Sequence, residues 1–159
     1  MLSFKIEQLA LCPRDPAAAI ALLNAMGAGD WAKDHVVAVG EVFGAPGRNE
    51  ADLAFAYDML GHGNELEVLH YTSGPNWMET PFHGHAVSHI GMHCGSAELE
   101  QWKEFFAERG IGIAQEVKTL SHENPVIAGK RWYHYCIFDT REILSVDVKF
   151  IVRLDEAPE

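Results

Sequence analysis

Four polar side chains stand out in this 159-residue chain because each interrupts a run of residues that is otherwise typical of a β-strand. They are Gln8 in FKIEQLAL, Glu67 in NELEVLHY, His89 in AVSHIGMHC and Asp147 in EILSVDVKFIV. Strand side chains alternate between two faces, and in each run the neighbouring aliphatic residues fall on the face opposite the polar one. A polar group on a covered face is costly unless it pairs or binds something. These residues are therefore the first candidates for chemistry.

The elements that would position these residues occur twice in the same order. In the first half a strand is followed by the helix PAAAIALLNAM, with Asp15 as its N-cap and proline at its first position, and then by three β-like runs. In the second half a strand is followed by the helix AELEQWKEFFAERG, with Ser96 as its N-cap, and three further β-like runs. The two caps lie 81 positions apart, and Glu67 lies 80 positions before Asp147. Two similar offsets predict a structural repeat.

The pattern predicts an α+β fold built from two βαβββ modules in a single domain, 1–159. The modules are 4–71 and 85–153, joined by a linker at 72–84 that contains prolines and glycines but no clear period. Helices must bury their apolar sides against the aliphatic faces of the strands. The opposite faces of a cupped mixed sheet would then line a concavity that holds Gln8 and Glu67 from one module, with His89 and Asp147 from the other.

Two stretches make the pattern more specific. VSHIGMH, followed by a helix cap and a helix, resembles the opening strand of a vicinal oxygen chelate module, and GNELEVLHY resembles its closing strand. This superfamily contains glyoxalases, bleomycin-resistance proteins and ring-cleaving dioxygenases, and the resemblance in module order covers nearly the whole chain. In metal-using members the opening strands supply His or Gln and the closing strands a carboxylate, usually Glu. The resemblance therefore implies that Gln8, Glu67, His89 and Asp147 bind one divalent ion. Asp147 departs from the pattern, since it is shorter than Glu and its assignment depends on the strand register.

Such a ligand set would suit Mg²⁺, Mn²⁺, Ni²⁺, Fe²⁺ or Zn²⁺, and the ligand types do not decide among them. The resemblance implies that a small substrate binds the ion through two adjacent oxygens, and that the ion stabilises an enediolate or oxyanion. Glu67 or Asp147 would act as general base. The expected function is a metal-dependent lyase or isomerase of glyoxalase type, with His93 and His134 lining the substrate cavity.

Two alternatives stay open. A metal-free binding protein, like the bleomycin-resistance branch, would keep the concavity and need no ligands. A ring-cleaving dioxygenase would need two histidines and one glutamate around Fe²⁺, and Gln8 stands where a histidine is required. His89 and His93 form an HxxxH pattern, but in a strand they would be roughly 13 Å apart and could not share an ion.

Composition limits the partners. The net charge is −11 with no extended basic patch, which argues against nucleic acid and anionic membrane surfaces. No apolar run approaches the roughly 18 residues of a membrane span, and no signal-peptide pattern is found. Three scattered cysteines indicate reduced thiols and a cytoplasmic location. A homodimer is expected because modules of this superfamily often pair between chains, and because Trp77, Trp102 and Trp132 are predicted to be exposed.

Overall fold

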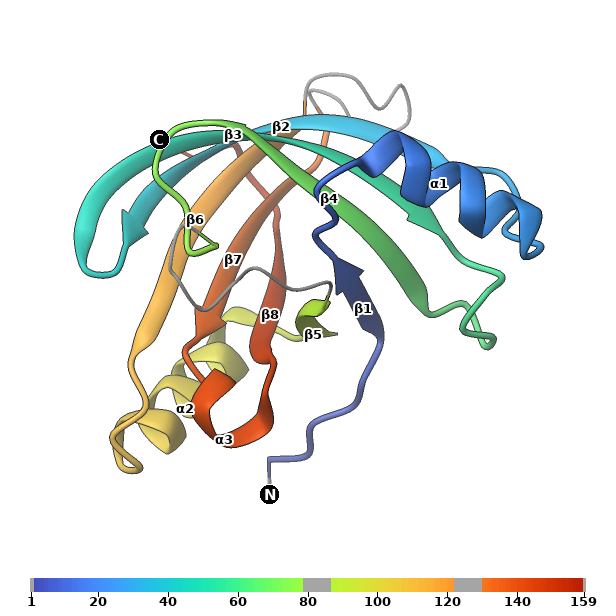
Figure 1. The fold of residues 1–159 in the computed structure, drawn as a ribbon. Helices are drawn as coiled ribbons and strands as arrows, with labels where there is room; N and C mark the ends of the chain where they lie inside the picture. The colour runs from blue at the N-terminus through green and yellow to red at the C-terminus, as the bar shows by residue number, and fades with distance from the viewer. Residues whose placement is uncertain (1, 79–86, 122–129, 159) are drawn as a thin grey trace.

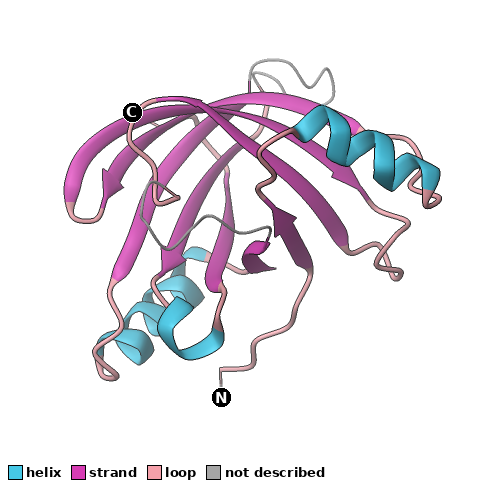
Figure 2. Ribbon diagram, in the orientation of Figure 1, coloured by secondary structure: helices cyan, strands magenta, loops and turns pink. Residues whose placement is uncertain are grey.

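The computed structural model describes residues 2–78, 87–121 and 130–158, and its elements follow the predicted order (Figures 1 and 2). The first half contains β1 (Gln8–Leu11), α1 (Pro16–Ala25), β2 (Ala32–Val42), β3 (Ala45–Ala56) and β4 (Glu65–Ser73). The second contains β5 (Val87–His93), α2 (Ser96–Ala107), β6 (Ile113–Ser121), β7 (Trp132–Phe138), α3 (Arg141–Leu144) and β8 (Asp147–Leu154). Residues 79–84 of the predicted linker lie outside the described residues.

The strands close into a strongly curved barrel, visible as a cup in Figure 1. In the described residues eight strands are hydrogen-bonded in the order β1-β4-β3-β2-β6-β7-β8-β5. Within each half the opening strand runs parallel to the closing strand, β1 beside β4 and β5 beside β8. The halves meet through two antiparallel pairs, β1 with β5 and β2 with β6. This arrangement confirms the predicted mixed α+β class.

The helices begin for the local reasons that the sequence contains. Asp15 Oδ1 accepts a hydrogen bond from the Ala18 backbone N–H at 2.9 Å, which caps α1, and Pro16 occupies its first position. The second helix begins at Ser96, with Gly95 rather than Ser96 as its N-cap. Helix α2 packs on the outward face of the sheet and buries Leu99, Trp102 and Phe106.

Two expectations need correction, one about the last strand and one about the tryptophans. The predicted last strand began before Asp147, but Arg141–Leu144 form the short helix α3 and β8 begins only at Asp147. Trp77 and Trp102 are buried within the chain, because Trp77 packs against Ala114 and Ile137 and Trp102 against the α2 core. They therefore give no reason for an interface, and the homodimer stays a prediction.

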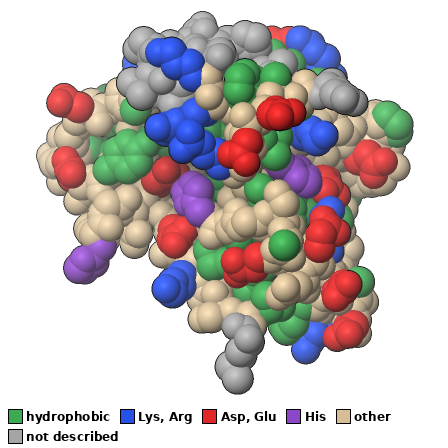
Figure 3. Space-filling model, turned by 180° about the vertical axis from the view of Figure 1, so that it is seen from behind, with side chains coloured by type: hydrophobic (Ala, Val, Ile, Leu, Met, Phe, Trp, Pro, Cys, Tyr) green, Lys and Arg blue, Asp and Glu red, His purple; other side chains and the backbone are tan. Residues whose placement is uncertain are grey.

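The outer surface agrees with the charge analysis. On the face drawn in Figure 3, acidic and basic side chains are interspersed and hydrophobic side chains form small separate patches. Within the described residues, no helix is both long and apolar enough to cross a membrane. The three cysteines are unpaired.

Candidate functional site

Two rows of residues on the same face of the sheet, across the junction of the two halves, position the site. Each row crosses β4, β1, β5 and β8 in turn, because neighbouring strands pair residue by residue. One row is Glu67, Ala10, His89 and Asp147; the next is Glu65, Gln8, Gly91 and Lys149. The pseudo-symmetry that relates β1 to β5 and β4 to β8 therefore matches Gln8 with His89 and Glu67 with Lys149.

Small residues in each row let the polar side chains meet. Glu67 Oε2 reaches across Ala10 to within 3.2 Å of His89 Nε2. Gln8 Oε1 reaches across Gly91 and accepts a hydrogen bond from Lys149 Nζ at 3.3 Å. A Cβ added to Gly91 would lie only 3.2 Å from Gln8 Oε1. The lack of a side chain at Gly91 is thus part of how the site is built.

The four side chains form one buried cluster. His89 Nε2 lies 2.9 Å from Gln8 Oε1, and Lys149 Nζ lies 3.7 Å from Glu67 Oε2 and 4.2 Å from the centre of the Tyr135 ring. None of the four residues is more than 4% exposed. A buried charge is tolerated when it is paired, and here Lys149 is surrounded by a carboxylate, an amide oxygen and an aromatic face.

Burial and charge together set the protonation of the cluster. Burial, and then the nearby Lys149 cation, lower the pKa of His89 to about 4, so the imidazole is neutral. Its Nε2–H then donates to Gln8 Oε1, while Nδ1 lies 3.1 Å from the Ser88 hydroxyl. Burial alone would raise the pKa of Glu67, but the charge of Lys149 and the hydrogen bond from His89 hold that pKa below its usual value. The cluster is therefore a Glu67–Lys149 ion pair beside a neutral histidine.

The structure brings Gln8, Glu67 and His89 together but places the Asp147 carboxylate elsewhere. Asp147 Oδ1 accepts hydrogen bonds from the backbone N–H groups of Thr140 and Arg141, at 3.0 and 3.1 Å. These donors lie at the start of α3, the helix that the sequence pattern did not predict. Lys149 occupies the position that matches Glu67, 82 residues away rather than the expected 80. Asp147 and Lys149 lie two residues apart and therefore face the same side of β8, which is why the alternation of faces could not distinguish them.

A divalent ion does not fit this arrangement. Three predicted donors converge, but the fourth place holds an ammonium group, which has no lone pair to offer and repels a second cation. Among the residues that the structure describes, no group of three or more His, Cys, Asp or Glu side chains could hold a metal ion. The metal that the fold family implies is thus at odds with the side chain at position 149.

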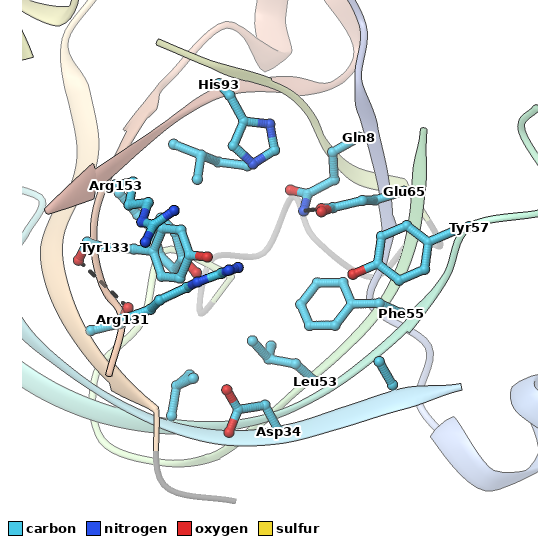
Figure 4. A pocket seen from close by; sticks show the side chains of 15 residues that line it. Gln8, Asp34, Leu53, Phe55, Tyr57, Glu65, His93, Arg131, Tyr133 and Arg153 are labelled. Atoms are coloured by element: carbon cyan, nitrogen blue, oxygen red, sulfur yellow. Dashed lines mark hydrogen bonds between the residues drawn. The ribbon is translucent and has the colours of Figure 1, made fainter. Parts of the chain in front are cut away.

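A cavity of about 460 Å³ opens above the cluster, and Figure 4 shows the side chains around it. Gln8 lies on its wall, where Gln8 Nε2 donates to Glu65 Oε2 at 2.8 Å. A smaller void of about 30 Å³ lies deeper and is bordered by Glu67, His89 and Lys149. Both spaces are lined by Thr119 and Tyr135, so the void borders the cavity on the side of the cluster.

The two further histidines lie on different sides of the wall. His93 lines the cavity, with its Nδ1 3.1 Å from Glu7 Oε2. His134 does not, because it alternates along β7 with the inward-facing Tyr133 and Tyr135. Its Nε2 lies 2.7 Å from Glu116 Oε1, and this hydrogen bond, together with Lys103, lowers the pKa of Glu116 to about 2.

Residues at the inner end of the void were not predicted. The Trp77 ring packs 5.9 Å from the His89 ring, and the Trp77 backbone N–H donates to Gln115 Oε1 at 3.2 Å. Asn49 also borders the void, and its buried Oδ1 has no hydrogen-bond partner among the described residues. Trp77 belongs to the predicted linker, so no periodic signal marked it. Lys149 could have been found, since it follows Asp147 by two residues on the same strand face.

No protein-family model matches the chain, and no curated protein does. Solved structures do match. A Streptomyces coelicolor methylmalonyl-CoA epimerase in complex with 2-nitronate-propionyl-CoA superposes with a TM-score of 0.52 at 13% identity, covering 97% of this chain and 98% of that one. The chain has the vicinal oxygen chelate fold.

Two further structures support the same fold. A methylmalonyl-CoA epimerase from Mycobacterium tuberculosis matches with a TM-score of 0.52 at 10% identity, over 99% of this chain and 94% of that chain. A hypothetical protein from Bacillus halodurans C-125 matches with a TM-score of 0.54 at 12% identity, over 98% of both chains. The fold predicted from the sequence is confirmed. At such low identity the match concerns the fold and not the activity.

Proposed function

We propose that this protein is a metal-independent isomerase or lyase that moves a proton on a small substrate inside the barrel. The observation that carries the proposal is the Lys149 ammonium group, held between Gln8 Oε1 at 3.3 Å and Glu67 Oε2 at 3.7 Å. In metal-using members of the fold an ion supplies positive charge at this place. Here a fixed cation in a buried site can stabilise a developing oxyanion instead.

The neighbouring groups suit a proton transfer next to a carbonyl. A substrate oxygen that enters the small void would accept a hydrogen bond from Lys149, and the ionised Glu67 would remove the proton. The attraction of Lys149 keeps the pKa of Glu67 low in the free protein. As the oxyanion forms it neutralises part of that attraction, so Glu67 becomes a stronger base when the proton is removed.

Deuterium exchange tests this chemistry directly. The solved neighbours are named as epimerases of methylmalonyl-CoA, so this thioester and the hemithioacetal of methylglyoxal and glutathione are suitable probes. The protein would be treated with a chelator and incubated with each probe in D₂O, and mass spectrometry would measure deuterium at the carbon next to the carbonyl. We expect Lys149→Met and Glu67→Gln to abolish the exchange. The exposed Lys118→Met variant serves as control, and exchange that survives in Lys149→Met would refute the proposal.

A metal-uptake experiment tests the role of Lys149 independently. Lys149→Glu gives the cluster two glutamates at pseudo-symmetric positions, with His89 and Gln8 as the other donors. We expect this variant to retain Ni²⁺ or Zn²⁺ after desalting, while the natural protein and Lys118→Glu do not. If the natural protein retains one ion per chain, the metal-dependent function predicted from the sequence takes the place of this proposal.

Ligand binding without chemistry is the second candidate function. It is favoured by the depth of the ion pair, since Glu67 is 1% exposed and the void beside it measures only about 30 Å³. A ligand held in the larger cavity could then stay out of reach of Glu67. Saturable binding of a probe with no deuterium exchange would select this function over the isomerase.

A further inference from the structure

Resting on the proposed function, we propose that Arg131 and Arg153 form an anion anchor at the mouth of the cavity. The anchor would bind the carboxylate of a substrate whose aromatic or apolar body lies deeper in the barrel. The inference names a substrate class that neither the shared fold nor the buried cluster specifies.

Strand register places Arg153 on the inner wall, where it pairs directly with Tyr133 on β7. Arg131 lies just before the first residue of β7, Trp132. Both arginines line the cavity. Figure 4 shows them entering from the same side, close to the Tyr133 ring.

These two arginines differ from Arg48 and Arg141 in their charged neighbours. Arg48 and Arg141 have close carboxylate partners, Glu50 at 2.7 Å and Asp139 at 2.6 Å. Within the described residues, no such ion pair occurs for Arg131 or Arg153, although acidic residues outnumber basic ones by 23 to 12. Arginines that face a cavity without a protein carboxylate can give their paired N–H donors to a ligand oxyanion.

The rest of the wall favours a carboxylate over a phosphate. Asp34 and Glu65 also line the cavity, and Glu65 accepts the hydrogen bond from Gln8. With acids on the same wall as the two arginines, a singly charged carboxylate is repelled less than a phosphate monoester, which carries nearly two negative charges. We therefore assign the anchor to a monoanionic carboxylate.

The remaining lining residues suit an apolar body. The Tyr133 and Tyr135 rings stack at 5.9 Å between centres, and Leu53 and Phe55 stand on the β3 part of the wall. Along β8, Arg153 is separated from Lys149 by four residues, roughly 13 Å of strand. A substrate held by its carboxylate at the mouth would thus direct its other end towards Lys149.

Calorimetric titration with three probes tests the anchor. The probes are phenylpyruvate, phenyl phosphate and the neutral ketone phenylacetone, and binding is measured at low and high salt. We expect phenylpyruvate to bind the natural protein best, and Arg131→Gln and Arg153→Gln each to weaken it about tenfold, as for a charge-assisted hydrogen bond. The double variant should bind phenylpyruvate more weakly than either single variant. The affinity for phenylacetone should be the same in all variants, and the control Arg48→Gln should bind phenylpyruvate as tightly as the natural protein does.

Three results would overturn the anchor. They are unchanged phenylpyruvate binding in the double variant, tighter binding of phenyl phosphate than of phenylpyruvate, and no binding of any probe at millimolar concentration. The test is separable from the proposed function. Binding that depends on the arginines, without deuterium exchange, would support the anchor and refute the isomerase. Exchange that depends on Lys149 and is unchanged in both arginine variants would support the isomerase and refute the anchor.

Discussion

The two halves of the barrel share an order of strands but differ in what their helices bury. Helix α2 inserts Leu99, Trp102 and Phe106 into an aromatic core with Phe138 and Phe150. Helix α1 has no buried residue, and a hollow of about 690 Å³ lies between it and β2, β3 and β4. Leu22 on this helix and its C-cap residue Met26 are 63% and 65% exposed. A repeated topology therefore does not imply repeated packing, and the helix of the second half contributes most of the helix–sheet core.

The halves also differ in the charge that they bring to the site. Gln8 and His89 occupy matched places and are both neutral, but Glu67 and Lys149 occupy matched places with opposite charges. Two carboxylates at these places would need a cation between them. A carboxylate and an ammonium group, by contrast, form an ion pair with each other. A lysine instead of a carboxylate at position 149 therefore changes the kind of site that the fold supports.

The largest expected effect compares the two helices. Trp102→Ala should lower the free energy of unfolding by about 3–5 kcal/mol, because it leaves a cavity in the aromatic core. Leu22→Ala on α1 should change it by less than about 0.5 kcal/mol, since that side chain is largely exposed. Urea denaturation measures both. Similar losses for the two variants would show that α1 is covered in solution, for example by a second copy of the chain.

The next effect concerns the ion pair that joins the halves. Lys149→Met should cost about 3 kcal/mol, because the buried Glu67 carboxylate loses its charge partner. The double variant Glu67→Gln/Lys149→Met should recover part of this loss, which denaturant titration of the four proteins in a double-mutant cycle measures. If the two substitutions are additive, the pair contributes no coupling and the site is not organised around Lys149.

A pH experiment isolates His89. Its pKa is lowered from 6.5 to about 4, so the unfolded chain binds more protons than the folded one between these values. Stability from this group is present above pH 6.5 and is lost as the pH falls towards about 4, by at most about 1.4 kcal/mol per pH unit. His89→Gln should flatten that slope in urea titrations. Burial raises the pKa of Asp147 to about 6, which contributes an opposite slope, but Asp147 is common to both proteins and cancels. An unchanged slope would mean that His89 is not held neutral.

The smallest effect tests the matched small residues. Gly91→Ala should cost about 1 kcal/mol, because the new methyl group crowds Gln8 at 3.2–3.3 Å. Ala10→Gly at the matched position in the first half is the control. Ala10 lies in the row of Glu67 and His89, so this change should leave the Gln8–Lys149 contact intact. Thermal unfolding detects the stability change. A Gly91→Ala protein as stable as the natural one would show that Gln8 does not need to cross that position.

The sequence by itself determined the module order, the start of α1 and the inward face of each strand that bears a site residue. It did so because alternation with period two, the Asp15–Pro16 cap and the apolar face of α2 are local properties of the chain. The same local rules identified Gln8, Glu67 and His89 as inward-facing polar residues. The prediction that His89 and His93 are too far apart along the strand to share an ion stays a prediction, and the two have separate partners: His89 contacts Gln8 and Glu67, and His93 contacts Glu7.

Only the tertiary structure decided which residue on β8 faces Glu67. Asp147 and Lys149 share a strand face, and the choice between them depends on pairing with β5 and on the helix α3, whose N–H groups bind the Asp147 carboxylate. Pairing between distant strands also placed Arg131 and Arg153 at one cavity mouth and buried Trp77 beneath His89. These contacts join residues far apart in the chain, and no local period or propensity records such pairing.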